Sequence, residues 1–76
     1  MYEELWTILV RDLQLRAEDV RPEASQHDAG LDSLATVELS LILSQRFHID
    51  ISDDELQEAA TVGDIARLME QRTPRV

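Results

Sequence analysis

The 76-residue sequence contains no cysteine and no lysine, and it has only two glycines, two prolines and one each of Trp, Tyr and Phe. Without cysteine, neither a disulfide nor a cysteine-ligated metal can stabilise the fold, so the packing of helices has to do so. A chain of this length forms one domain that buries roughly 60% of its unfolded surface, which leaves room only for a thin core. We therefore expect neither a deep catalytic cleft nor a metal site.

Long apolar runs are absent as well. The longest have three residues, such as 41–43, and are far too short to span a bilayer, and the segment 1–4 is acidic where a signal peptide would be basic. Sixteen acidic residues oppose seven basic ones, all of them arginine, for a formal net charge of −9. This charge repels nucleic acid and anionic lipid and attracts basic protein surfaces. We expect a cytoplasmic monomer whose partners are proteins with basic docking surfaces, with no nucleic acid and no membrane among them.

Hydrophobic periodicity predicts two helices in the first two thirds of the chain. Apolar residues at helical spacing indicate a helix over 2–13, and residues 33–47, rich in Leu and free of Gly and Pro, indicate a second. Between them, residues 15–31 lack a sustained period and contain a proline, so they are interpreted as a long loop pinned by Leu15 and Val20.

Capping signals predict two further helices. Residues 48–51 alternate like a strand but have no partner, so we expect an extended connection that buries Ile49 or Ile51. Ser52 and Glu55 then match a capping box that begins a short helix over 53–58. A last helix is capped by Thr61 and ends before Pro74. The residues expected to form the core of the four helices are Leu5, Ile8, Leu9, Leu13, Leu39, Leu43, Phe47, Val62, Ile65, Ala66 and Met69.

These elements define an all-α fold. The prediction is a small four-helix bundle with three longer helices and a short third one. Residues 1–72 form a single domain, and residues 73–76 are expected to be a disordered tail.

The stretch 30–34, Gly-Leu-Asp-Ser-Leu, places a hydroxyl where a loop becomes a helix. Gly30 closes the loop, and Ser33 lies at the helix N-terminus, where backbone N–H groups lack partners and the macrodipole is positive. Such a position favours an anion attached to or bound near the hydroxyl, and a phosphodiester would fit there. Alternatively, Asp32 or Ser33 only caps the helix, which is the commoner role of an Asp-Ser pair. These residues alone do not decide between the two interpretations.

The helix over 33–47 has two apolar stripes where a surface helix needs one. The stripe assigned to the core contains Leu39, Leu43 and Phe47. The second stripe, which begins beside Ser33, contains Leu34, Val37 and Leu41 with the acidic Glu38. Either both stripes are buried in a helix packed on two sides, or the second is exposed. Because so short a chain can hardly cover this helix all round, we expect the second stripe to be exposed and to bind partners.

Enzyme motifs do not fit the sequence. A serine hydrolase needs a base beside its nucleophile and usually the pattern G-x-S-x-G on a strand-turn-helix elbow, whereas Ser33 lies in Gly-Leu-Asp-Ser-Leu-Ala. The acidic residues 50–55 lack the glycine and alternating ligands of an EF-hand, and no glycine-rich phosphate loop is present. His27 and His48 are interpreted as solvated side chains, since neither has a second ligand at a metal-site spacing.

Taken together, these motifs resemble the acyl carrier proteins over nearly the whole chain. The most specific part is Asp32-Ser33-Leu34 followed by Thr-Val-Glu-Leu at 36–39. The segment 60–64, Ala-Thr-Val-Gly-Asp, is similar to the entry into the last helix of that family.

The resemblance implies a free-standing, non-catalytic carrier. In that family the serine matching Ser33, flanked here by Asp32 and Leu34, is esterified by 4′-phosphopantetheine, which a basic, magnesium-dependent phosphopantetheinyl transferase takes from coenzyme A. The arm ends in a thiol that holds acyl groups as thioesters. The helix corresponding to 33–47 is the family's partner-recognition helix, and the transferase, the acyl-loading enzymes and the synthases are therefore the implied partners. The residues assigned to this contact are Leu34, Val37, Glu38 and Leu41.

Two departures from the family pattern qualify this interpretation. Gln26 and Ala29 stand where large apolar anchors often precede the Gly-x-Asp-Ser segment, which predicts a looser loop. The recognition helix is also less acidic than in fatty-acid carriers. The residues that replace common acidic positions are Ala35, Ser44, Gln45 and Arg46.

The second departure favours a carrier for polyketide or related specialised biosynthesis over the housekeeping fatty-acid carrier. A free-standing aminoacyl or peptidyl carrier is the near alternative. A hypothesis from another class is an unmodified acidic helical adaptor that binds partners through the helix 33–47 alone.

Overall fold

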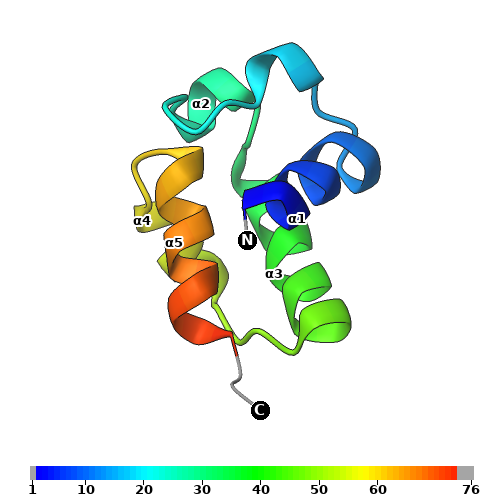
Figure 1. Cartoon of the computed structure of the whole chain (residues 1–76), viewed down its shortest axis with the longest axis vertical. Helices are drawn as coiled ribbons and strands as arrows, with labels where there is room; N and C mark the ends of the chain where they lie inside the picture. The colour runs from blue at the N-terminus through cyan, green and yellow to red at the C-terminus, as the bar shows by residue number, and fades with distance from the viewer. Residues whose placement is uncertain (1, 74–76) are drawn as a thin grey trace.

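The computed structural model describes residues 2–73, and the regular elements within this range are all helical (Figure 1). The all-α prediction is therefore confirmed. The elements, in chain order, are α1 (Tyr2–Thr7), a π-helical continuation η1 (Ile8–Asp12), a 3₁₀ turn η2 (Ala17–Asp19), α2 (Gln26–Ala29), α3 (Ser33–Phe47), α4 (Asp53–Glu58) and α5 (Val62–Arg72).

The predicted count of four helices is wrong for the described residues, because α2 is a fifth α-helix inside the segment interpreted as a loop. This single turn forms between two strong end signals. The Ser25 hydroxyl accepts a hydrogen bond from the Asp28 backbone N–H at 3.1 Å. Gly30, with φ of 92°, closes the turn by donating its N–H to the His27 carbonyl at 3.1 Å. Four residues are too few to show a hydrophobic period, so periodicity could not reveal this helix.

The helix predicted over 2–13 is present as α1 and η1, with a change of hydrogen-bonding pattern at Ile8. Leu13 donates its N–H to the Ile8 carbonyl at 3.0 Å, the i to i−5 spacing of a π-turn. The predicted helices over 33–47 and 53–58 match α3 and α4, and α5 begins directly after its predicted cap Thr61.

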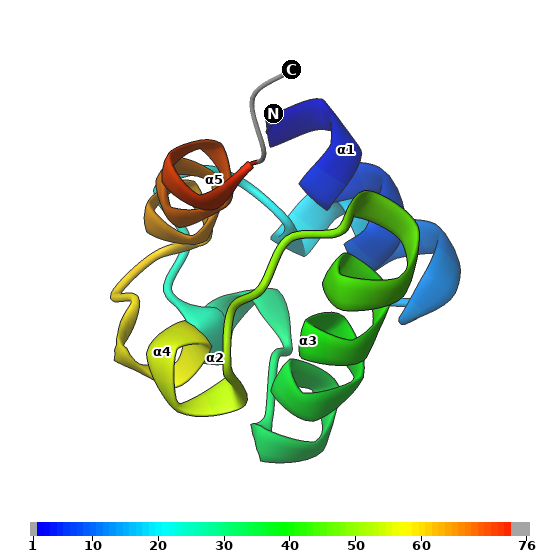
Figure 2. The same cartoon turned by 90° about the horizontal axis from the view of Figure 1, so that it is seen from below.

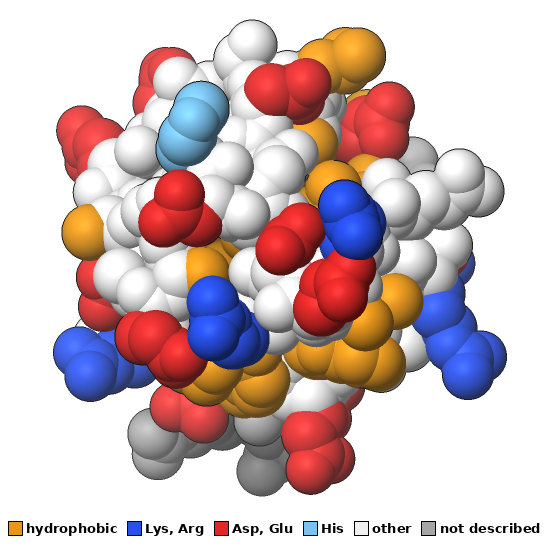
Figure 3. Space-filling view, turned by 90° about the horizontal axis from the view of Figure 1, so that it is seen from above, with side chains coloured by type: hydrophobic (Ala, Val, Ile, Leu, Met, Phe, Trp, Pro, Cys, Tyr) orange, Lys and Arg blue, Asp and Glu red, His pale blue; other side chains and the backbone are white. Residues whose placement is uncertain are grey.

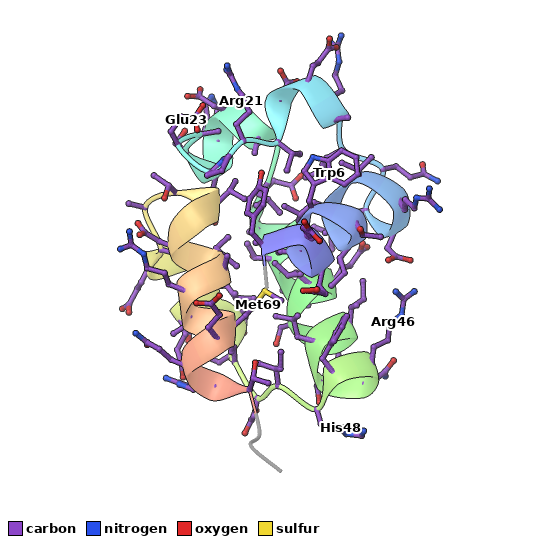
Figure 4. All side chains as sticks on the ribbon, in the orientation of Figure 1. Trp6, Arg21, Glu23, Arg46, His48 and Met69 are labelled. Carbon is purple, nitrogen blue, oxygen red and sulfur yellow. The ribbon has the colours of Figure 1, made fainter. Side chains whose placement is uncertain are left out.

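The core lies between two pairs of helices, with α1 and α3 on one side and α4 and α5 on the other (Figures 1 and 2). Met69 points from α5 into this space (Figure 4). Both Ile49 and Ile51 of the extended connection are buried, where the prediction required only one of them. Leu13, Leu15 and Phe47 are partly buried at the edge of the core. The fully buried large side chains are Leu5, Ile8, Leu9, Leu39, Leu43, Ile49, Ile51, Leu56, Val62, Ile65 and Met69 together with Thr36.

The segment before α3 is anchored by a hydrogen-bonding side chain, where a looser loop was expected from Gln26 and Ala29. The Gln26 side-chain amide donates to the Leu56 carbonyl at 2.6 Å and also to the Ala59 carbonyl, so it caps the C-terminal end of α4. Ala29 is buried. A polar anchor therefore replaces the apolar one, because the last carbonyls of a helix need donors that the helix cannot supply.

A second attachment joins the loop to the start of α5. Val62 donates its N–H to the Ala24 carbonyl at 3.0 Å, and Gly63 donates to the Pro22 carbonyl at 2.9 Å. A Cβ at position 63 would lie 2.9 Å from the Pro22 oxygen, which is closer than real Cβ atoms come. Only glycine fits this approach without a backbone shift.

The predicted capping box at α4 forms only in part. The Ser52 hydroxyl accepts from the Glu55 N–H at 3.2 Å, as expected. The Glu55 carboxylate does not complete the box but lies 2.7 Å from Arg72 of α5. The prediction of a disordered tail falls on residues 74–76, which lie outside the described residues, and on Thr73, whose hydroxyl donates to the Met69 carbonyl at 2.5 Å.

Candidate functional site

Ser33 is the first residue of α3, and its side chain is exposed. The residue that caps the helix is Asp32, whose Oδ1 accepts from the Ala35 N–H at 2.8 Å. Within the described part of the chain, the Ser33 hydroxyl makes no hydrogen bond. Of the two capping residues proposed from the sequence, Asp32 has the capping role, and the hydroxyl of Ser33 is left free for another use.

The loop geometry explains why Asp32 faces solvent and caps α3. Gly30 turns the chain in the left-handed region, and Leu31 then enters the core, with its N–H donated to the Gln26 carbonyl at 2.8 Å. Asp32 follows in an extended conformation, with φ of −100° and ψ of −176°. Because successive side chains in extended backbone point to opposite sides, burial of Leu31 turns Asp32 towards solvent, where it caps α3.

The electrostatics at this point favour a negatively charged substituent. The 15 residues of α3 form the longest helix of the described chain, and its N-terminus carries a partial positive charge. The backbone N–H groups of Ser33 and Leu34 begin the helix, where no preceding turn supplies carbonyl partners. No histidine or other base is hydrogen-bonded to the Ser33 hydroxyl among the described residues.

The exposed face of α3 next to Ser33 is apolar. Leu34, Val37 and Leu41 are exposed to 67%, 39% and 56%, and they are the exposed large hydrophobic side chains of the described chain. Glu38, on the same face, is exposed as well. The alternative in which both stripes of this helix are buried is therefore wrong. We refer to Leu34, Val37, Glu38 and Leu41 as the α3 face.

The opposite stripe of α3 faces the core. Leu39 and Leu43 are fully buried, and Phe47 is partly buried at the end of the helix. Arg46 extends from α3 and forms two hydrogen bonds with Asp12 of η1, at 2.9 and 2.7 Å (Figure 4). This arginine was noted in the sequence as a departure from the acidic pattern, and the ion pair places it against η1.

Sequence reasoning gave no role to Thr36, which is buried in the first turn of α3 and bonded to Ser33 and Gln57. The signal available in the sequence was its position three residues after Ser33, where a threonine hydroxyl can reach back to a carbonyl. Gln57 was likewise not singled out, since its bond crosses from α4 and depends on tertiary structure.

One hollow lies away from Ser33 on the surface of the described residues. An open hollow of about 400 Å³ lies between α4 and α5, lined by residues that include Glu58, Ala59 and Leu68. Acidic side chains predominate on the face formed by the loop before α3 (Figure 3).

His27 and His48 are exposed, as expected. Over residues 2–73, no helix has the length and apolar character needed to cross a membrane, and no group of three or more potential ligands could hold a metal ion.

The helical fold and the free hydroxyl at a helix N-terminus are compatible with a covalently attached anionic group. The sequence matches the family described as "Phosphopantetheine attachment site" over residues 3–69. It is 37% identical over 71 residues to the "Acyl carrier protein" of Wolinella succinogenes, and the alignment covers 92% of this chain and 93% of that protein. The chain therefore belongs to the acyl carrier protein family.

This membership confirms the resemblance inferred from the motifs and settles the class of function. The protein is a non-catalytic carrier, and the cofactor of its domain is a covalently attached 4′-phosphopantetheine. Proteins of this family interact with phosphopantetheinyl transferases and with synthase enzymes.

Proposed function

We propose that Ser33 is the residue to which the phosphopantetheine arm is attached. The observation that carries this proposal is the division of roles at the start of α3, where Asp32 caps the helix and the exposed Ser33 hydroxyl has no partner in the described chain. The site fits the group, since an exposed hydroxyl at the positive end of a 15-residue helix can hold a phosphodiester without a buried charge.

During attachment, Ser33 Oγ forms a bond to phosphorus as the pyrophosphate bond of coenzyme A breaks, and adenosine 3′,5′-bisphosphate leaves. The hydroxyl proton passes to the transferase, because this chain holds no base at the hydroxyl in its described part. Asp32 keeps the first turn of α3 in place through its bond to Ala35. Its Oδ2 makes no hydrogen bond among residues 2–73 and is available to a basic group of the transferase.

The α3 face is the proposed docking surface for the transferase, the acyl-loading enzymes and the synthases. Exposed apolar side chains grouped beside a functional residue are typical of a protein interface, and Glu38 adds one negative charge to them. Basic partners are further favoured by the net charge of −9.

For the pathway, we infer polyketide or related specialised biosynthesis in the cytoplasm, with the carrier acting as a monomer. The support is the low acidity of α3, in which Glu38 is the only acidic residue and Arg46 is paired with Asp12. A partner of such a helix relies more on apolar contact than a partner of a strongly acidic one.

Mass spectrometry after incubation with coenzyme A and a broad-specificity phosphopantetheinyl transferase tests the attachment residue. The wild-type chain should gain one phosphopantetheinyl group, and Ser33→Ala should gain none while keeping its helical circular dichroism. Ser44→Ala, which changes another exposed serine of α3, serves as the matched control and should be modified normally. Modification of Ser33→Ala at another serine would overturn the assignment. A wild-type chain that stays unmodified would contradict the assignment as well.

A further inference from the structure

Thr36 is a polar residue in an otherwise apolar interior. It is 1% exposed, and it is the one buried polar side chain found among the described residues. Its hydroxyl donates to the Ser33 carbonyl at 2.8 Å and lies 3.4 Å from the Gln57 side-chain amide, from which it accepts. A buried hydroxyl costs free energy unless it is hydrogen-bonded, so these two partners account for its tolerance in the core.

These hydrogen bonds explain how the Thr36 hydroxyl can be buried, but they do not explain why this position has a hydroxyl at all. Valine has nearly the same shape, carries no polar group and would bury an additional methyl group at this position. A threonine hydroxyl that bonds back to its own helix also tends to destabilise and bend the helix slightly. Packing alone therefore favours valine over threonine, and the reason for the hydroxyl has to be sought in what it holds.

The bonds of Thr36 converge on the segment that presents Ser33. Its backbone N–H donates to the Asp32 carbonyl at 3.0 Å, and its hydroxyl bonds the carbonyl of Ser33 itself. Gln57 belongs to α4, so the chain of bonds from Gln57 through Thr36 to Ser33 connects that helix with the first turn of α3. Two neighbouring carbonyls at the helix start are thus fixed by one residue.

We propose that Thr36 is a positioning residue for arm attachment. Its hydroxyl holds the first turn of α3 against α4, so that the free Ser33 hydroxyl is presented to the transferase in one orientation. The proposal rests on the assignment of Ser33 as the attachment residue. Correct orientation of a nucleophile contributes to the rate of the reaction and not to docking, so loss of the Thr36 hydroxyl lowers kcat and leaves KM nearly unchanged.

The variant Thr36→Val removes the hydroxyl at almost constant volume. Its kcat for phosphopantetheine attachment should fall about three- to tenfold, the size expected for one neutral hydrogen bond. KM should change by less than about twofold, because the α3 face is intact. Thr7→Val is the matched control, since the Thr7 hydroxyl makes a similar bond, 3.0 Å to the Glu3 carbonyl, in the exposed part of α1. This control should react at the wild-type rate.

A second pair of variants isolates the hydroxyl if the valine variant folds poorly. Thr36→Ser and Thr36→Ala both lose the methyl group and differ only in the hydroxyl, so the serine variant should react about three- to tenfold faster than the alanine variant. Rates are compared at equal folded fraction, measured by circular dichroism. Equal rates for serine and alanine, or a wild-type kcat for Thr36→Val, would overturn the proposal.

These outcomes are distinguishable from failure of the proposed function. If the wild-type chain is modified at a serine other than Ser33, the attachment residue is wrong and Thr36 loses the role given to it. If the wild-type chain is modified at Ser33 and the Thr36 variants react like it, only the positioning role fails.

Discussion

The two leucines at positions 41 and 43 allow a matched test of which face of α3 supports the fold. They lie in the same helix, and truncation to alanine removes the same atoms at each position. Leu43 is fully buried, whereas Leu41 is 56% exposed. The structure therefore predicts a large difference in stability between Leu43→Ala and Leu41→Ala, since their intrinsic helix propensities change equally.

The expected magnitudes follow from the burial. Leu43→Ala loses buried methyl groups and leaves a cavity, which costs about 2–5 kcal/mol of unfolding free energy. A domain of 76 residues has a total stability of about 4–11 kcal/mol, so this loss is a large part of the whole. Even the lower limit corresponds to a fall in Tm of about 8–16 °C. Leu41→Ala should change the unfolding free energy by about 0.5 kcal/mol or less.

Thermal and urea denaturation followed by circular dichroism measure the stability difference, and the rate of arm attachment measures partner binding. Leu41→Ala should keep its Tm and lower kcat/KM for attachment, because apolar residues near the centre of a small interface dominate its energy. The reasoning is refuted if Leu41→Ala unfolds the chain while Leu43→Ala only slows attachment, or if the two variants lose equal stability.

Three further predictions concern the loop, the surface charge and the response to pH. Gly63→Ala should destabilise the chain by about 1–3 kcal/mol, as measured by urea denaturation, because its Cβ would meet the Pro22 carbonyl at 2.9 Å. Association with a transferase in stopped-flow experiments should slow as ionic strength rises, and Glu38→Arg should slow it further; a rate indifferent to both would contradict charge steering. Burial, with a smaller effect of Glu23, raises the pKa of Tyr2 above its ordinary value of 10.0. The folded state therefore favours the neutral phenol, and the resulting stability is complete below pH 10.0 and is lost as pH rises through the higher pKa of the folded state. Alkaline titration of Tyr2→Phe should lack this decline.

The longer helices could be predicted from the sequence because each has signals that act locally. The bounds of α3 follow from a run without Gly or Pro, preceded by Asp32 as a cap. Ser52 and Thr61 cap α4 and α5 through bonds to residues three positions later, which a sequence pattern can reveal. In these segments the helix predicted from local sequence signals is the helix found in the structure.

The features that were missed depend on contacts between distant segments. Gln26 was interpreted as a weakness of the loop, because its role as a cap for α4 requires partners 30 and 33 residues away. Glu55 was expected to complete a local capping box, but Arg72 is close enough in the fold to pair with it. In both cases a polar side chain is bonded to a partner that is distant in the sequence, and a local sequence pattern cannot reveal such a partner.

At the candidate site, the sequence pointed to the start of α3 but did not decide whether Ser33 holds an anionic group or whether Asp32 or Ser33 only caps the helix. An Asp-Ser pair at a helix start gives no indication of which side chain is the cap, since both can accept a backbone N–H. The geometry resolves this point, because the extended conformation of Asp32 directs its carboxylate to Ala35. The exposure of Leu34 and Leu41 was predicted from the amount of surface that so short a chain can cover, which is a global argument and not a local one.

The large negative charge of the chain affects which molecules can associate with the exposed α3 face. Apolar side chains grouped on a surface promote association with any other apolar surface, including a second copy of the same chain. A net charge of −9 on a chain of 76 residues opposes association between identical copies, since each repels the other. The same charge attracts a basic partner, for which the apolar contact then adds affinity. We therefore propose that the charge selects among the partners of the α3 face and keeps the exposed apolar residues beside Ser33 from causing self-association.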